Sequence, residues 1–542
     1  MLLILRGYFL VSFILAQCAF ADTAKNPLVA KEQELNIGNL SDPKTLDPQK
    51  CNEKVCEAII LQLFEGLVRN SIDGHVLPAA AESWMISADG KTYHFTLRKN
   101  LKWSDGTKLT AEDFVFTMKR LVDPKVASEY STLFENVENG KDIIEGKKSI
   151  DSLGVKANDE RNLEIKLITA TPHFLKNLTI SNTFPTQRNN VEMHGDTEEA
   201  FTAAGILISN GPFKLSDRKV GNKVTVIRNE HYWNVESVYL SKLNFHSVND
   251  LLTEYRMFEM GQLDATDSIP VDLFKQIKKK YVNEFKAVPF LGSYYYVFNT
   301  QRPPFNNKKL RQALSIVIDR DAIVQKVLGR GEKSLYDFVP YGMSNYTQAK
   351  PYWQDWTREQ QLIEAKKLYK EAGYTAKKPL SVHILIGALD VHQKIATAIS
   401  SIWKKELGVN TILQNDEWKR ILDKRKIGDF EIMQISFVAD INDVSNLFIQ
   451  LRSSDPANDA HFKNKVYDSI INKAVVENNL AMRQKLFQQG ANILAEEQPI
   501  IPIFNIVSLY LVRPYVTGFK KNILDHYYLT DVHLKEKPKN FD

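Results

Sequence analysis

Segments with the periodicity of strands and of helices alternate along this chain without a fixed repeat, and this alternation limits its possible folds. Residues 91–98 place large apolar side chains at every second position, the pattern of a half-buried strand. Residues 308–328 and 392–407 carry apolar stripes at helical spacing, and residues 430–438 have the composition of a buried strand. The mixture predicts an α/β to α+β fold. Because 542 residues exceed one ordinary domain, we expect roughly two to four domains.

The N-terminus has the pattern of a secretory signal peptide. Arg6 precedes a short apolar run over residues 8–16, and the small-x-small motif of residues 19–21 follows. The run is too short for a membrane span, and no later segment approaches eighteen continuous apolar residues. The alternatives are an N-terminal anchor helix and a lipoprotein modified at Cys18. Gln17 argues against the lipoprotein, because a small residue is expected there. We expect residues 1–21 to be removed on secretion.

Composition and charge narrow the class of protein. The chain is 44% hydrophobic and 25% charged, as in globular proteins, and its net charge is only +5. Basic residues are interspersed with acidic ones, which excludes the concentrated basic surface of a nucleic-acid binder. After residue 21 the only cysteines are Cys51 and Cys56. They could form one disulfide in an oxidising compartment, or Cys56 could pack on a helix with both thiols free.

Local motifs for catalysis or cofactor binding are missing. The sequence has no His-Glu-x-x-His, no Gly-x-Ser-x-Gly and no Cys-x-x-Cys, and its eleven histidines are scattered. Residues 329–334 superficially resemble a phosphate loop but lack its Gly-Lys-Ser/Thr ending. We therefore predict a protein without catalysis, cofactor or metal.

Several separate blocks, in family order, make this chain similar to one known family. They lie at Leu63-Phe64-Glu65-Gly66-Leu67, Ala81-Glu82-Ser83-Trp84, Asp89 to Arg98, Lys102-Trp103-Ser104-Asp105-Gly106, Asn210-Gly211-Pro212-Phe213, Pro303-Pro304-Phe305-Asn306 and Ile318-Asp319-Arg320. The chain resembles the periplasmic oligopeptide-binding proteins of ABC importers, within the peptide/nickel family of solute-binding proteins. Most of these residues are expected to be turns, caps and core rather than ligand contacts.

The resemblance implies a two-lobe periplasmic-binding-protein fold, type II and cluster C, with an extra third domain. Carried onto this sequence, lobe one would comprise residues 22–68, 191–291 and 508–542. The extra domain would be residues 69–190, and lobe two residues 292–507. Two crossings between the lobes would form a hinge over which they close on a ligand.

Asp440 is the leading candidate for the partner of a peptide's ammonium. It follows the strand predicted at 430–438, and ligands of open α/β sheets favour the crevice beyond the carboxyl ends of strands. The resemblance implies the same role, because relatives hold the peptide amino terminus with an aspartate at this place. Phe437, Val438 and Ala439 directly precede it and are candidate ligand contacts. The alternative for Asp440 is a helix-capping or turn aspartate.

Candidates for the carboxylate end rest on the same resemblance. His392, in the first turn of a predicted helix, matches a histidine that can face a longer peptide's carboxylate. Arg425 matches a basic residue of similar role, and Trp418 matches a pocket-lining tryptophan. The alternatives are solvated basic side chains and a core tryptophan. Gln434 stands where peptide binders carry an arginine for a tripeptide carboxylate, which weakens the expectation of tight tripeptide binding.

Two further departures concern lobe two and its pocket. Gly292 and Val438 occupy the positions of the family's lobe-two disulfide, so that bridge is absent. Val297 and Cys56 replace family pocket acids, which implies an altered ligand preference.

The resulting prediction is a monomeric periplasmic protein that captures oligopeptides between two lobes and delivers them to membrane permease subunits of an ABC transporter. One alternative keeps the fold and changes the ligand to a murein peptide, a metal chelate or haem. Two others are a secreted peptidase and a chaperone-like or adhesive protein for unfolded chains.

Overall fold

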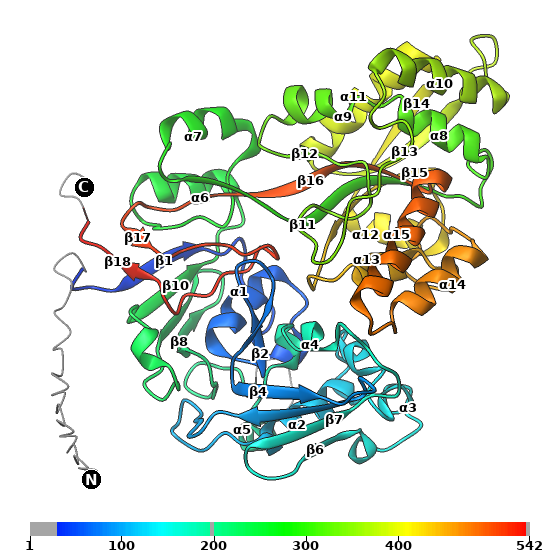
Figure 1. The fold of residues 1–542 in the computed structure, drawn as a ribbon. Helices are drawn as coiled ribbons and strands as arrows, with labels where there is room; N and C mark the ends of the chain where they lie inside the picture. The colour runs from blue at the N-terminus through cyan, green and yellow to red at the C-terminus, as the bar shows by residue number, and fades with distance from the viewer. Residues whose placement is uncertain (1–29, 196–199, 538–542) are drawn as a thin grey trace, which may run out of the picture.

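The computed structural model describes residues 30–195 and 200–537, and the expected signal peptide at 1–21 lies outside them. No helix among these residues is long and apolar enough to cross a membrane. Three sheets organise the chain (Figure 1). This mixture of helices and strands is the α/β architecture that the sequence predicts.

The first sheet has four strands and is built from distant parts of the chain. Its order is β1 (Glu34–Gly38), β10 (Lys242–His246), β9 (Lys223–Arg228) and β8 (Phe213–Lys219). β1 runs parallel to β10, and the other neighbours are antiparallel. Helix α1 (Lys54–Leu63) packs into the core of this sheet through Ile59, Ile60 and Leu63. Helices α6 (Leu251–Glu259) and α7 (Phe274–Lys280) form a smaller apolar cluster with the C-terminal part of β16.

The second sheet has six strands. Its order is β12 (Lys333–Ser334), β16 (Ile500–Leu511), β11 (Phe285–Phe298), β15 (Ile432–Val438), β13 (Ser381–Gly387) and β14 (Asn410–Asp416). One core contains side chains of α8 (Lys308–Ile316), α10 (Arg358–Glu371) and α11 (Asp390–Leu407). Another contains side chains of α13 (Ser445–Phe448), α14 (Lys465–Ala474) and α15 (Leu480–Glu497). The sheet therefore has a helix-covered core on each face.

The third sheet has the order β4 (Ala81–Ile86), β5 (Thr92–Leu97), β7 (Asn162–Lys166) and β6 (Val155–Ala157), all antiparallel. Helix α2 (Ala111–Val122) packs on it and begins with a capping box, in which Thr110 and Asp113 satisfy each other's backbone N–H groups. Short helices α3 (Gly140–Ile144), α4 (Phe174–Asn177) and α5 (Arg188–His194) complete this part. Two small hairpin-like pairs join β2 (Val68–Asn70) to β3 (Val76–Pro78) and β17 (Val516–Thr517) to β18 (His533–Leu534).

β11 and β16 are the two long strands that connect the first and second sheet regions. Their antiparallel pairing has two register shifts, a larger one between Pro289 and Ser293 and a second one between Tyr294 and Tyr295. Within the larger shift the Leu291 N–H donates to the Ile523 carbonyl (2.7 Å) instead of to β16. The ladder is therefore interrupted where the chain passes from one region to the other.

One expected helix is divided. The sequence predicts a single helix over 308–328, but the structure has α8, then α9 (Arg320–Ala322), then a π-helical turn from Ile323 to Leu328. The side chain of Asp319 accepts a hydrogen bond from the Ala322 N–H (2.9 Å), which starts a new helix end. This capping interaction, which apolar spacing does not reveal, interrupts the helix.

Candidate functional site

The carboxyl end of β15 enters a cleft bounded by segments from all three sheet regions. Val438 lies opposite Gly292 on β11, and the Ala439 N–H donates to the Leu291 carbonyl (2.9 Å). The next residue, Asp440, leaves the strand, and its N–H donates to the Asn446 side chain (3.2 Å). The last strand residues thus hold the Asp440 carboxylate at the sheet edge.

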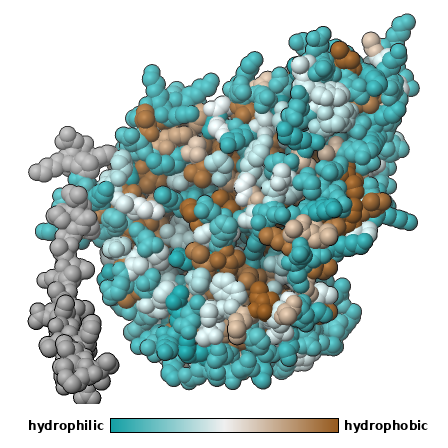
Figure 2. All heavy atoms as spheres, viewed as in Figure 1, coloured by the Kyte–Doolittle hydropathy of each residue, from teal (hydrophilic) through white to brown (hydrophobic). Residues whose placement is uncertain are grey.

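The cleft has a volume of about 410 Å³. It is lined by Cys51, Asn52, Glu53, Lys54, Glu57, Tyr130, Ile180, Ser181, Asn182, Phe290, Val438, Ala439, Asp440, Leu524, Asp525 and His526. These residues come from the start of α1, from the segments flanking the third sheet, from β11 and β15, and from the C-terminal segment. Figure 2 shows apolar side chains gathered near the middle of the face that it presents, with hydrophilic side chains around the rim. A ligand of a few residues fits a cleft of this size.

The disulfide between Cys51 and Cys56 shapes the wall of the cleft at the start of α1. Its two Cα atoms are 6.0 Å apart, and the bond closes the turn that leads into α1. The Asn182 side chain donates to the Cys51 carbonyl (2.8 Å) and fixes the same turn. Of the two states that the sequence leaves open for these cysteines, the structure has the bonded one.

Two lysines near the cleft already have partners. Lys54 pairs with Asp267 (3.0 Å) and Asp525 (2.7 Å). Lys521, which is almost fully buried, lies 3.5 Å and 3.3 Å from the same two carboxylates. Although burial alone would raise the pKa of Asp525, Lys521 and Lys54 hold it well below the ordinary value. Two cations and two anions therefore balance inside the protein.

Glu57 and His526 form the next pair. The Nε2 atom of His526 lies 3.2 Å from a Glu57 carboxylate oxygen, and the two side chains are 19% and 23% exposed. Burial alone would lower the pKa of His526, but the charge of Glu57 raises it above the ordinary value. Burial alone would raise the pKa of Glu57, but His526 and then Lys54 lower it. The pair is neutral only while His526 carries its proton.

Asp440 differs from these groups because its charge is not balanced. Among the described residues, no lysine or arginine pairs with it; its nearby cation, His526, belongs to Glu57. The Asp440 side chain is exposed to solvent, but partial burial by the surrounding protein raises its pKa, as does the charge of Glu57. A carboxylate with a raised pKa and no internal lysine or arginine partner among the described residues can accept a cation from outside the protein.

The other residues predicted at the site are held in different ways. The Nδ1 atom of His392 lies 3.1 Å from the Tyr294 hydroxyl, and the two rings stack at 5.6 Å. Burial lowers the pKa of His392, which favours a neutral ring. Arg425, on α12 (Trp418–Ile427), pairs with Asp459. Neither side chain lines the cleft that contains Asp440.

Three predicted positions remain. Trp418 begins α12, and its side chain lies outside the described part of the structure. Gln434 is buried, and its side-chain amide donates to the Ser436 hydroxyl (3.3 Å). Phe437 is half-buried, with its ring 6.3 Å from Phe338. Of the eight predicted residues, Val438, Ala439 and Asp440 line the cleft together.

Sequence reasoning missed Lys54, Glu57 and His526. Glu57 and Lys54 read as an ordinary charged start of a helix, and His526 lies about 470 residues away in a segment without a motif. The signal that was present is the cysteine pair, since a bond between Cys51 and Cys56 places the side chains between and beside them on one tight turn.

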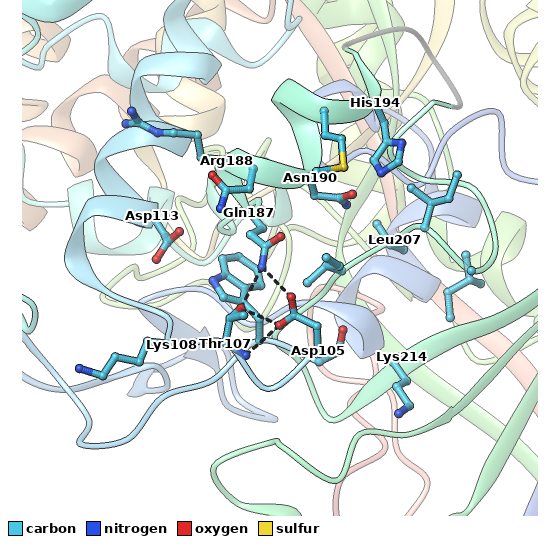
Figure 3. A pocket seen from close by; sticks show the side chains of 18 of the residues that line it. Asp105, Thr107, Lys108, Asp113, Gln187, Arg188, Asn190, His194, Leu207 and Lys214 are labelled. Atoms are coloured by element: carbon cyan, nitrogen blue, oxygen red, sulfur yellow. Dashed lines mark hydrogen bonds between the residues drawn. The ribbon is translucent and has the colours of Figure 1, made fainter.

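A second hollow lies away from β15, between the turn before α2, helix α5 and the start of β8 (Figure 3). Its volume is about 780 Å³, and Gln187 donates there to Asp105 (3.2 Å) and Thr107 (3.0 Å). Its basic residues Lys108, Arg188 and Lys214 are mixed with Asp105, Glu112 and Asp113. No unbalanced charge comparable to Asp440 stands out among them.

The end of β15 that leads into the cleft has one edge without a neighbouring strand among the described residues. β11 pairs with β15 along Ile432–Val438, but β13 pairs with it only at Ile432 and Met433. Within the described sheet, the far edge of residues 434–438 therefore has no neighbouring strand. An extended segment can add to an open edge of this kind through main-chain hydrogen bonds.

No group of three or more histidine, cysteine, aspartate or glutamate side chains suited to a metal occurs among the described residues.

Comparison with known proteins identifies the family. Residues 75–459 match the model for bacterial extracellular solute-binding proteins, family 5. The chain is 36% identical over 518 residues to the periplasmic oligopeptide-binding protein OppA of Escherichia coli, covering 95% of each chain. It is similar to the solved structure of the Escherichia coli murein tripeptide-binding protein MppA (TM-score 0.80, 35% identity, 94% and 100% covered).

The complex of Haemophilus influenzae OppA with the peptide RPPGFSPFR is a further solved match (TM-score 0.77, 32% identity, 94% and 100% covered). These relatives are binding proteins by name, and their two-lobe fold is the fold of this chain. The chain belongs to the bacterial extracellular solute-binding proteins of family 5.

Proposed function

We propose that this protein binds the amino-terminal end of an extended oligopeptide in the cleft at Asp440 and delivers the peptide to an ABC importer. The observation that carries this proposal is the carboxylate of Asp440, which has no lysine or arginine partner among the described residues. A peptide α-ammonium supplies the missing charge. The open edge of β15 beside it can pair with the peptide main chain, whatever the side chains are.

The remaining parts of the proposal follow from the family. The protein works as a monomer in the periplasm, without catalysis, after removal of residues 1–21. Its lobes comprise residues 22–68, 191–291 and 508–542, and residues 292–507, with residues 69–190 as the extra domain. The irregular stretch of β11 and β16 supports a hinge at residues 291 and 508.

His392, Arg425, Trp418 and Gln434 stay in the proposal as contacts to more distant parts of a ligand. For Arg425 this requires that the ligand compete with Asp459. For His392 it requires that a neutral ring donate a hydrogen bond to the ligand.

Calorimetry with trialanine and N-acetyl-trialanine tests the Asp440 role. We expect the acetylated peptide to bind at least about 30-fold more weakly, because acetylation removes the charge that Asp440 requires. Asp440→Asn should weaken trialanine by a similar factor. Asp355→Asn is the matched control, since Asp355 is an exposed carboxylate paired with Lys350 on lobe two. Equal affinity for the two peptides would refute the role of Asp440.

Two measurements test the rest. Trialanine should be recovered intact after long incubation, whereas cleavage would identify a peptidase. Native mass spectrometry of the purified protein should show a co-purified peptide on a monomer; a murein peptide, a chelate or haem would instead identify one of the other ligands.

A further inference from the structure

The cleft contains a second carboxylate beside Asp440. Glu57 lines the same cleft and is 23% exposed, so a ligand can reach it. Glu57, Asp440 and Tyr130 line the same cleft, and the charge of Glu57 raises the pKa of Asp440. A ligand whose ammonium sits at Asp440 therefore brings its first residue close to Glu57.

The counter-ion of Glu57 is unusual because it can lose its charge. Lys54 is the other cation on this turn, but Asp267 and Asp525 already hold it. Among the described residues, this leaves His526, at 3.2 Å, as the partner of Glu57. A histidine changes charge near neutral pH, unlike the lysines and the arginine that pair with Asp267, Asp525 and Asp443.

Resting on the proposed peptide-binding function, we propose that Glu57 is a second cation site, which takes the side-chain ammonium or guanidinium of the ligand's first residue. His526 is its built-in, protonatable competitor. Protein and ligand then meet through two pairs, the α-ammonium with Asp440 and the side-chain cation with Glu57. Peptides that begin with lysine, arginine or a similar diamino acid form the preferred ligand class.

The direction of the pH effect follows from the groups that face His526. Glu57 and Lys54 approach it from α1, Asp525 from its own segment, and Asp440 from the end of β15. The combined effect of these charges raises the pKa of His526 above its ordinary value, so the competitor is charged at acidic pH. As pH rises through that pKa, His526 becomes neutral and Glu57 loses its paired charge, keeping the lesser influence of Lys54. Preference for a cationic first residue must therefore grow with pH.

The test compares Lys-Ala-Ala with norleucine-Ala-Ala, two peptides of nearly equal shape that differ by one ammonium. Calorimetry between pH 5.5 and 7.5 gives the ratio of their affinities, in which the shared α-ammonium cancels. For the wild-type protein we expect the preference for Lys-Ala-Ala to increase about fivefold over this range.

Three variants test which residues cause the pH-dependent preference for Lys-Ala-Ala. His526→Gln should show the high preference at every pH, because the competitor is gone. Glu57→Gln should show no preference at any pH. His533→Gln is the matched control. His533 lies in the same C-terminal segment, its ring contacts that of Tyr239 in a tilted arrangement, and it does not line the cleft, so the variant should behave as wild type.

The outcomes separate this inference from the function on which it rests. A preference that does not change with pH in the wild type, with both peptides still bound and acetylation still disruptive, overturns the Glu57 site and leaves the Asp440 role intact. Failure of all these tripeptides to bind, and of tetra-alanine and penta-alanine as well, overturns both. Thermal unfolding of each variant, compared with wild type, shows that lost preference does not come from lost folding.

Discussion

At the scale of single residues, Asp440 stands out because, among the described residues, no lysine or arginine pairs with its carboxylate. Asp443, only three residues further along the chain, is the clearest contrast. Its carboxylate lies 2.7 Å and 3.0 Å from the Arg483 guanidinium and 3.1 Å from Lys176. Burial alone would raise the pKa of Asp443, but these two cations hold it far below its ordinary value. Asp443 therefore has internal partners, whereas Asp440 is the carboxylate that we propose for the ligand.

Asp443→Asn tests the structural half of this contrast. We expect the free energy of unfolding to fall by about 3 kcal/mol, because the substitution leaves a buried arginine without its partner. Urea unfolding at pH 7 measures the loss. Asp429→Asn is the control, since Asp429 pairs with Arg302 at an exposed site, and it should cost less than about 1 kcal/mol.

The same pair of variants gives a pH dependence with a defined sign. Because the folded-state pKa of Asp443 lies below its unfolded value, its contribution is fully present above about pH 4 and is lost as pH falls toward the folded pKa. The difference in stability between wild type and Asp443→Asn should therefore shrink below about pH 4. A difference that grew on acidification would contradict the assigned charge state.

At the scale of elements, the periodicity of apolar residues correctly predicted the positions of several helices and strands. β5, α11 and β15 lie where the apolar patterns of 91–98, 392–407 and 430–438 place them, and Gly408 ends α11 in the left-handed conformation with φ +75°. The division of 308–328 escaped because one side chain, that of Asp319, starts a new helical turn. The cleft was predictable only in part. Asp440 follows β15 closely in sequence, whereas Glu57 and His526 meet only through tertiary folding.

The start of α1 is the element on which two of these residues depend. The Cys51–Cys56 disulfide spans a separation of five residues around Lys54 and ends beside Glu57. Replacing both cysteines by serine should lower the free energy of unfolding by about 2 kcal/mol, the chain-entropy value for so short a loop. Affinity for trialanine should fall as well, because the turn that lines the cleft loses its constraint.

Urea unfolding with and without reductant checks this expectation. Reductant should bring the wild-type protein to the stability of the double variant and should leave the double variant unchanged. A wild-type protein that is insensitive to reductant would show that the bond does not constrain this turn in solution.

At the scale of the whole molecule, the unbalanced carboxylate bears on how the lobes move. The cleft is accessible, and solvent reaches Asp440. Closing the lobes over an empty cleft would remove water from a charge that has no partner, which is costly. Closing them over a bound ammonium would bury a pair instead. Asp440 should therefore both attract the ligand and keep the ligand-free protein open.

Small-angle X-ray scattering distinguishes this double role from simple binding. Trialanine should reduce the radius of gyration of the wild-type protein toward about 24 Å, the value for a compact chain of this length. N-acetyl-trialanine should not. Asp440→Asn without any ligand should be more compact than the ligand-free wild-type protein, because its neutral side chain no longer opposes closure. If the variant is as open as the ligand-free wild type, Asp440 binds the ligand without controlling the lobes, and the hinge at β11 and β16 alone sets the open state.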